Sequence, residues 1–329
     1  MMRRREVIPL LGSAITAWPL VARAQRNDRV RRVGVIMGFA ENDVVWQAYL
    51  ATFRRGLQDL GWTEGRNIRF DQRFTGENEE RMRSMAEEVV ALAPDAILVS
   101  TNSVVSATLK ATHSIPIVFT WVSDPVGSGF VTNLAHPGGN ITGFHNFEPA
   151  IAGKWLDFLR QIAPTLNRVA VVHVPEIVPN VAFLRVVKAA APPMGIAVTA
   201  AEVRSAADIE RVLTDFGREG GGLIVTPSAL TATRRDIIIG LAARFGLPAI
   251  YSFGFYASSG GLISYGINQL ELVRSAASYV DRILRGASPG ELPVQLPLKY
   301  ELVINLKTAA ALGLSVPNSL QLLADEVIE

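Results

Sequence analysis

The fold of this chain is decided by two stretches, DAILVSTNSVVSATLKATHSIPIVF at residues 95–119 and GGLIVTPSALTATRRDIIIGLAARFGLPAIY at residues 221–251. Each begins with an apolar strand, continues through hydroxyl side chains into a helix, and ends with a proline and a second apolar strand. This order is typical of a right-handed unit with two parallel strands. Although any two parallel-sheet units look somewhat alike, the repetition predicts two lobes of similar fold.

The segments around these stretches extend the same plan. RRVGVIMG at residues 31–38 and RVAVVHV at residues 168–174 are further apolar strands, each followed by a segment of helical period. A chain of 329 residues is also long for one compact core. We therefore predict an α/β protein of two Rossmann-like lobes with parallel sheets, joined by a hinge that the chain crosses several times. Lobe 1 is expected to comprise residues 31–143 plus about 262–292, and lobe 2 residues 144–261 plus about 293–329.

The first 24 residues have the three-part layout of an export signal. Arg3, Arg4 and Arg5 precede an apolar run over residues 7–21, which ends in the small-x-small pattern of residues 22–24. The run is short and interrupted by prolines, which disfavours a membrane span. We expect a cleavable signal at residues 1–24 and a periplasmic protein; the arginines loosely match a twin-arginine signal.

Charge and cysteine content exclude several classes of function. Four of the 32 basic and one of the 30 acidic residues lie in residues 1–24, so the remainder has a net charge of −1 and offers no basic face for nucleic acid. The absence of cysteine excludes disulfides, thiolate zinc sites, a cysteine nucleophile and a lipid-modified cysteine.

Candidate ligand contacts lie where the predicted strands end, because ligands gather beyond the carboxyl ends of parallel strands. Hydroxyl and amide side chains precede two helices, where they either cap the helix or help to hold an anion. Asp124 follows another strand and is either a turn residue beside Pro125 or the partner of a ligand ammonium group. Aromatic rings near the same ends either pack in the core or line an apolar pocket. The predicted ligand-binding residues are Phe39, Trp46, Ser100, Thr101, Asn102, Ser103, Trp121, Asp124, Thr226, Ser228, Tyr251 and Tyr265.

Signals for catalysis, metals and cofactors are missing from the sequence. The histidines His113, His136, His145 and His173 have no metal-binding spacing, and neither a GxSxG elbow nor a phosphate-binding loop occurs. The first strand also lacks the GxGxxG pattern of dinucleotide sites. We expect no cofactor, no metal and no catalytic residues.

Three segments carry a resemblance to a known family. They are IPIVFTWVSDPVGSGFVTNLAHPGGNITG at residues 115–143, YVDRILRGASPGELPVQ at residues 279–295 and YELVINLKTAAALGLSVP at residues 300–317. With them the chain resembles the substrate-binding proteins of ABC transporters with the type I periplasmic fold, in the branch related to tryptophan- and tyrosine-binding proteins.

The resemblance implies a bilobal protein, expected to be a monomer, that closes on a small molecule and presents it to a membrane permease with its ATPase. It implies that residues 100–103 and Asp124 contact the ligand from the first lobe, with Thr226, Ser228 and Tyr251 facing them. Gln25 stands where lipoprotein members of this branch have a cysteine, which favours a freely diffusing periplasmic protein.

Other functions remain open from the sequence. The rings suggest an aromatic or branched amino acid or a related compound as the ligand. An α/β enzyme on the same scaffold and a periplasmic ligand-sensing domain are the alternatives. A transcription regulator with two such lobes would need a DNA-binding helix pair ahead of residue 30, where only the signal-like segment stands.

Overall fold

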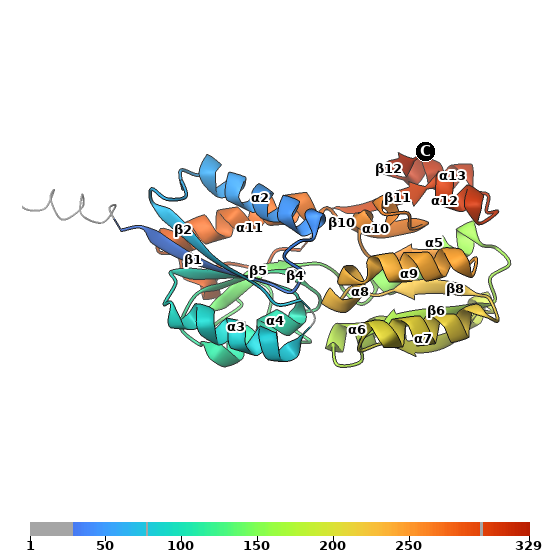
Figure 1. The fold of residues 1–329 in the computed structure, drawn as a ribbon, viewed down its shortest axis with the longest axis horizontal. Helices are drawn as coiled ribbons and strands as arrows, with labels where there is room; N and C mark the ends of the chain where they lie inside the picture. The colour runs from blue at the N-terminus through green and yellow to red at the C-terminus, as the bar shows by residue number, and fades with distance from the viewer. Residues whose placement is uncertain (1–28, 77, 297–298) are drawn as a thin grey trace, which may run out of the picture.

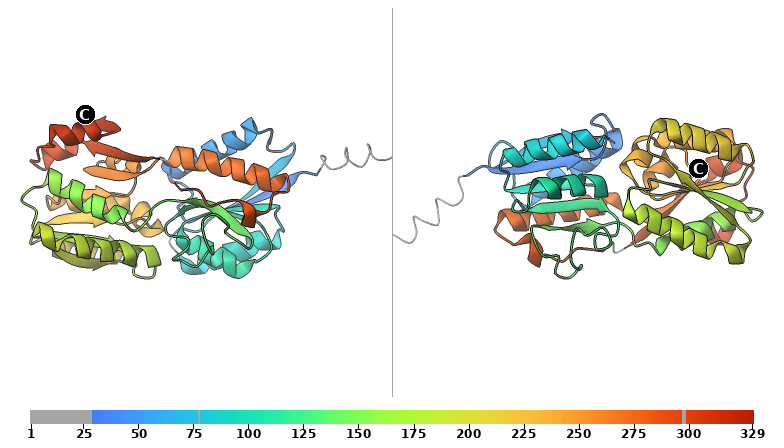
Figure 2. Two further views of the ribbon diagram at one scale, coloured as in Figure 1. Left: turned by 180° about the vertical axis from the view of Figure 1, so that it is seen from behind. Right: turned by 90° about the horizontal axis from the view of Figure 1, so that it is seen from below.

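The computed structural model describes residues 29–76, 78–296 and 299–329, so the expected signal at residues 1–24 lies outside the described residues. Two α/β units, here called lobes, lie side by side along the long axis of the molecule (Figure 1). Two further views show the same separation (Figure 2). No helix among the described residues combines the length and the apolarity needed to cross a membrane.

The first lobe is built on a five-stranded parallel sheet in the order β2-β1-β3-β4-β5. Helices α2 and α11 pack together on one face, and α3 and α4 pack together on the other. Because both faces are covered, every residue of β3 and β4 is buried. The elements are β1 (Arg31–Met37), α2 (Val44–Asp59), β2 (Ile68–Phe74), α3 (Glu79–Ala91), β3 (Ala96–Ser100), α4 (Asn102–Ala111), β4 (Ile117–Val122), β5 (Ile141–His145) and α11 (Gln269–Leu284).

The second lobe is built on a seven-stranded sheet in the order β12-β11-β10-β9-β8-β6-β7. Its strands β7-β6-β8-β9-β10 are parallel and repeat the order of the first sheet; β11 joins antiparallel to β10. The two repeated stretches of sequence thus occupy equivalent places in the two sheets. The elements are α5 (Ile151–Ile162), β6 (Arg168–His173), α6 (Val178–Ala190), η1 (Pro192–Met194), β7 (Ala197–Glu202), α7 (Ala206–Gly217), β8 (Gly222–Val225), α8 (Ala229–Thr233), α9 (Arg235–Arg244), β9 (Ala249–Tyr251), α10 (Gly254–Ser258), β10 (Ile263–Ile267), β11 (Tyr300–Asn305), α12 (Leu306–Ala311), α13 (Asn318–Leu323) and β12 (Glu326–Ile328).

The observed strand pairing moves the expected lobe boundaries. The chain passes between lobes after β5, after β10, and between Gln295 and Tyr300. The residues from 262 to 267 were expected in lobe 1, but β10 pairs with β9 and β11 in the second sheet. Val294 and Gln295 were expected in lobe 2, but their backbone N–H groups donate to Leu134 and Gly143 of the first lobe. A short apolar strand is compatible with either sheet, so the sequence alone did not place β10.

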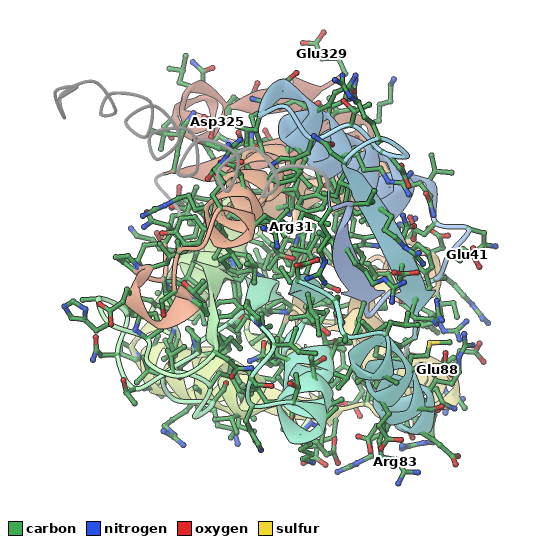
Figure 3. All side chains as sticks on the ribbon, turned by 90° about the vertical axis from the view of Figure 1, so that its left-hand side faces the viewer. Arg31, Glu41, Arg83, Glu88, Asp325 and Glu329 are labelled. Atoms are coloured by element: carbon green, nitrogen blue, oxygen red, sulfur yellow. The ribbon has the colours of Figure 1, made fainter. Side chains whose placement is uncertain are left out.

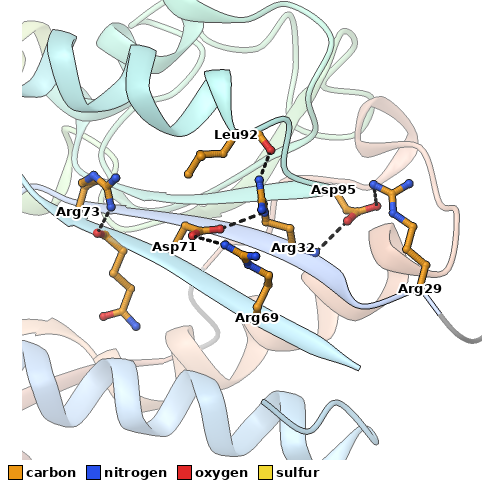
Figure 4. Close-up of polar contacts among 8 residues, drawn as sticks. Arg29, Arg32, Arg69, Asp71, Arg73, Leu92 and Asp95 are labelled. Carbon is orange, nitrogen blue, oxygen red and sulfur yellow. Dashed lines mark hydrogen bonds and ion pairs between the residues drawn. The ribbon is translucent and has the colours of Figure 1, made fainter. Parts of the chain in front are cut away.

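The outer end of the first sheet is held by ion pairs. The Asp95 carboxylate accepts hydrogen bonds from the Arg31 guanidinium at 2.8 Å and from the backbone N–H of Arg32 at 2.9 Å. Figure 4 shows the contact of Asp95 with Arg32 and the ion pairs of Asp71 with Arg32 and Arg69. Arg83 and Glu88 of α3 project from the same lobe at the outer surface (Figure 3). These pairs stabilise the amino ends of β1 and β3. They do not involve the carboxyl ends of these strands, which lie at the opposite edge of the sheet.

Gly143 in β5 gives a test of this packing. A Cβ atom there would lie 2.2 Å from the Phe119 carbonyl oxygen of β4, and backbone cannot yield as a side chain can. We expect Gly143→Ala to lower the free energy of unfolding by about 2 kcal/mol or more, measured by guanidinium chloride denaturation. As the control, Gly240→Ala lies in α9 with no heavy atom within 4 Å, and should raise it by up to about 1 kcal/mol. Equal effects of the two substitutions would contradict the assigned register of β4 and β5.

Candidate functional site

A pocket lies between the carboxyl ends of the two sheets. It has an empty volume of about 340 Å³ and receives side chains from both lobes. The first lobe contributes residues that follow β1 and β3 and one residue, Trp121, near the end of β4; the second lobe contributes residues that follow β6, β8 and β9. The lining residues are Phe39, Thr101, Asn102, Trp121, Ile177, Pro227, Ser228, Ala229 and Phe253.

The backbone is strained on the first-lobe side of this pocket. Among the described residues, the non-glycine positions with positive φ are Ala93, Thr101, Trp121 and Asp124, and the last three lie at the carboxyl ends of β3 and β4. Residues other than glycine rarely adopt a positive φ, and backbone strain of this kind is common at functional sites. The bend at Thr101 needs a glycine opposite it, because a Cβ on Gly38 would lie 2.8 Å from the Thr101 hydroxyl oxygen.

Asn102 fixes the loop that begins at Ser123. Its side-chain amide donates to the Ser123 carbonyl oxygen at 2.8 Å and to the Ser128 hydroxyl at 3.0 Å. Its amide oxygen accepts from the Ser123 backbone N–H at 3.0 Å. The start of α4 and the loop after β4 are therefore tied together, which holds Thr101 and Trp121 at fixed positions in the pocket wall.

An aromatic cluster supports the same wall and reaches the other lobe. The ring of Trp46 stacks on Phe39 with centroids 3.4 Å apart and meets Trp121 edge-on at 4.9 Å. Phe255 of the second lobe meets Trp46 edge-on at 5.7 Å. Trp46 is thus buried behind the pocket and joins the two lobes, instead of lining the pocket itself.

An ion pair also joins the lobes beside this cluster. The Arg235 guanidinium of α9 donates to Asp43 at the start of α2, with 2.6 Å between Nη1 and Oδ2. The other carboxylate oxygen of Asp43 accepts from the backbone N–H of Val45 and so caps α2. The two charged side chains are only 14% and 9% exposed, so the pair is formed where water is largely excluded.

The predicted site residues fall into three groups. Phe39, Thr101, Asn102, Trp121 and Ser228 are brought together in the interlobe pocket. Ser103 lies just outside, in a wider groove of about 1300 Å³ that also spans both lobes. The remaining predicted residues are Trp46, Ser100, Asp124, Thr226, Tyr251 and Tyr265, and their side chains lie outside the pocket.

Four of these remaining residues are engaged within one lobe, and we leave them out of the proposed site. The Ser100 hydroxyl accepts from the Gly38 backbone N–H at 2.9 Å, and the Thr226 hydroxyl donates to the Val172 carbonyl oxygen at 2.9 Å. Tyr251 is buried and stacks on the Tyr256 ring. Tyr265 packs against Phe158 and Tyr300 of the second lobe.

Asp124 folds back on its own loop. Its Oδ1 atom accepts a hydrogen bond from the Gly127 backbone N–H at 2.9 Å, which is the turn geometry that was one of the two expectations. A Cβ on Gly127 would lie 2.1 Å from Asp124 Oδ2, so the carboxylate rests directly over this glycine. That close approach explains one of the glycines in the loop after β4.

Sequence reasoning missed several residues that build the site. Ile177, Pro227, Ala229 and Phe253 line the pocket without having been selected, although Pro227 and Phe253 directly follow predicted strands. Asp43 and Arg235 were also missed. A polar residue at a helix start was the available signal for Asp43, but nothing in the sequence pairs it with a residue 192 positions away.

A family match agrees with this geometry. The model of the family described as "ABC transporter substrate binding protein" matches residues 33–328. This chain belongs to that family. Substrate-binding proteins of this kind bind small molecules and work with ABC permeases outside the cytoplasm, and a two-lobed pocket suits that task.

Individual proteins show the same relationship. The substrate-binding protein is 26% identical over 277 residues to the tyrosine-binding protein of Clostridioides difficile, covering 83% of this chain and 80% of that protein. It matches the structure of the ABC domain in complex with L-Trp from Streptococcus pneumoniae with a TM-score of 0.84 at 22% identity, covering 91% and 99% of the chains. For the ligand-free, open structure of a substrate binding protein from Clostridium difficile, the TM-score is 0.65 at 24% identity with the same coverage.

Contacts of this substrate-binding protein indicate how its lobes are arranged. The Arg235–Asp43 ion pair and the ring contact of Phe255 with Trp46 both join the lobes, which agrees with a closed form.

The Asp43–Arg235 pair gives a test of closure. Asn caps helices as well as Asp does, so Asp43→Asn keeps the start of α2 and removes the charge that Arg235 meets. We expect this variant to lose about 1–2 kcal/mol of the preference for the closed form, seen as a larger radius of gyration in small-angle X-ray scattering. The control is Asp236→Asn, because that carboxylate lies 3.9 Å from Arg235 but is 84% exposed. Unchanged scattering of the Asp43 variant would show that the pair does not hold the lobes together.

His145 lies at the end of β5, where the chain leaves the first lobe, and its ring is buried. It is 2% exposed, lines a hollow of about 460 Å³, and neither ring nitrogen has a hydrogen-bond partner among the described residues. Burial lowers the pKa of His145 from 6.5 to about 4, and the negative charge of Asp124 only partly opposes this. The ring is therefore neutral at pH 7.

The lowered pKa makes stability depend on pH. The unfolded chain takes up a proton at His145 near pH 6.5, whereas the folded chain resists it until about pH 4, so stability is lost as the pH falls through this window. The free energy of unfolding should fall between pH 7.5 and pH 4. We expect His145→Phe to make this fall smaller by about 2–3 kcal/mol, measured by urea denaturation. His136→Gln, at an exposed position, should keep the wild-type dependence. The same pH slope in all three proteins would refute the burial argument.

Proposed function

We propose that this protein is the extracytoplasmic solute-binding component of an ABC importer, which closes its two lobes on one small molecule. The observation that carries the proposal is the shared pocket, whose walls come from both lobes beside a cross-lobe ion pair. A ligand that touches both walls favours the closed form by its differential affinity for that form. No covalent chemistry is needed for this task.

The proposed ligand is an aromatic or branched amino acid or a related compound. Phe39, Trp121 and Phe253 give the pocket three rings, while Thr101 and Ser228 offer hydroxyl groups. Small-molecule sites are typically lined in this way, by apolar surface with a few fixed polar groups. The name of the relative from Clostridioides difficile supports the amino acid class.

The proposed partners and location follow from the same function. The closed form would dock on a membrane permease that works with an ATPase, and the protein would act as a periplasmic monomer after removal of residues 1–24. The arginines in that segment support a twin-arginine route. A periplasmic sensor domain would use the same pocket, and loss of solute uptake on deleting the gene separates transport from sensing.

An enzyme on this scaffold is not favoured by the pocket. None of its lining residues is a histidine, lysine or acid, so the acid–base pairs of hydrolytic or transfer chemistry are not at hand. The described residues also contain no cluster of three or more histidine, aspartate or glutamate side chains that could hold a metal. We therefore propose binding without turnover.

Trp121 tests whether the pocket is the binding site. The purified protein is screened by thermal unfolding against the proteinogenic amino acids and their 2-hydroxy and 2-oxo acid counterparts, and the Kd of the most stabilising compound is measured by calorimetry. We expect Trp121→Ala to raise this Kd by about tenfold or more, because the ring borders the pocket. Trp62→Ala is the control, since that ring bonds to Asp281 within the first lobe. Equal affinities of the two variants would place the binding site elsewhere.

A further inference from the structure

Two residues that line the interlobe pocket have side-chain hydrogen-bond donors with no acceptor among the described residues. The indole nitrogen of Trp121 and the hydroxyl oxygen of Thr101 are shielded from solvent and have no partner among the described residues. Trp121 is 5% exposed and Thr101 is 7% exposed, and both line the pocket. An indole N–H can only donate, and a hydroxyl can donate. A ligand that brings an acceptor removes the cost of leaving these groups unpaired.

The first turn of α4 adds donors at the same place. The backbone N–H groups of Asn102, Ser103 and Val104 form no hydrogen bond within the described chain, and the Thr101 side chain does not cap the helix. Thr101 and Asn102 both line the pocket, so this helix start borders it. The start of a helix carries a partial positive charge and favours an anion. The helix end and the two unpaired side chains together point to a negatively charged group.

Three acceptors around the pocket already receive a hydrogen bond. The Asn102 amide oxygen accepts from the Ser123 N–H at 3.0 Å, and the Pro227 carbonyl oxygen accepts from Asn180 at 3.0 Å. The Ser228 hydroxyl accepts from the Thr231 backbone N–H at 3.0 Å. An ammonium group brings only donors, and no side chain that lines the pocket offers it a negative charge.

The two nearby carboxylates are engaged as well. The oxygens of Asp43 accept from the Val45 N–H and from Arg235, and the Asp124 carboxylate rests over Gly127. Neither residue lines the pocket. The negative charge that an ammonium group normally needs is therefore not presented to the ligand.

We propose that the ligand is a carboxylic acid with an apolar or aromatic body and no ammonium group, such as an unsubstituted, 2-hydroxy or 2-oxo acid. Its carboxylate lies at the start of α4 and accepts from the Thr101 hydroxyl, and its body packs between Phe39 and Phe253. This inference rests on the proposed function, and it narrows the proposed ligand from amino acids and related compounds to the related acids that lack the amino group.

Matched compounds test the charge requirement by isothermal titration calorimetry at pH 7.5. The pairs are 3-phenylpropanoate with L-phenylalanine and 4-methylpentanoate with L-leucine, which differ only in the ammonium group. We expect the acid of at least one pair to bind at least tenfold more tightly than its amino acid. The corresponding amide, 3-phenylpropanamide, lacks the negative charge and should bind at least tenfold more weakly than its acid.

Variants of α4 test the position of the carboxylate. Thr101→Val keeps the branched shape and removes the hydroxyl, so we expect it to weaken the tighter-binding acid by about tenfold. Thr101→Ser keeps the hydroxyl and should retain most of the affinity. Thr108→Val makes the same change on the same helix, but the Thr108 hydroxyl donates to the Val104 carbonyl oxygen away from the pocket, so affinity should be unchanged.

Other outcomes would contradict either the carboxylate inference alone or the proposed function as well. Amino acids that bind as tightly as the acids, an amide that binds as tightly as its acid, or equal losses in the two valine variants overturn the carboxylate inference. The proposed function survives those results if binding still depends on Trp121. If none of the screened acids and amino acids binds and none lowers the radius of gyration, both the inference and the proposed function fail.

Discussion

Among the contacts described between the lobes, the pair of Arg235 with Asp43 is the charged one, and it is largely desolvated. Each partner is held by its own lobe, because Asp43 also caps α2 and Arg235 sits over the Phe255 ring at 5.7 Å from its centroid. A buried pair loses hydration as it forms, so the net gain over two solvated charges is small. That balance suits a binding protein. A strong pair would keep the lobes closed without a ligand, whereas a weak one lets the ligand decide.

The first lobe prepares its half of the pocket before any ligand arrives. The left-handed backbone at Thr101 and Trp121 costs free energy, and the Asn102 hydrogen bonds to Ser123 and Ser128 keep it in place. The second lobe is tied down less directly, through the Asn180 bond to Pro227 and the cap of α8 by Ser228. A ligand would thus meet a rigid wall in the first lobe and be covered when the second lobe swings over it.

Much of this arrangement followed from the sequence, and the failures have identifiable causes. The repeated strand–helix–strand stretches predicted both sheets. Several of the strand ends chosen from the sequence lie around the interlobe pocket, because parallel strands bring their carboxyl ends to one edge. Side-chain direction at a strand end was not predictable: Thr101 lines the pocket, while Ser100 turns to Gly38. The pairing of Asp43 with Arg235 and the sheet chosen by β10 depend on contacts between distant parts of the chain, which no local pattern encodes.

The unpaired donors in the pocket bear directly on how selective the protein can be. A site that leaves an indole N–H and a hydroxyl buried without acceptors is destabilised unless its ligand supplies them. Compounds that fill the pocket with apolar surface alone would leave that cost in place and so favour closure weakly. Discrimination then arises in the closed form, where water cannot substitute for the missing acceptor. In the proposed site, the strained backbone that presents Thr101 and Trp121 would therefore contribute to recognition of the ligand as well as to the shape of the pocket.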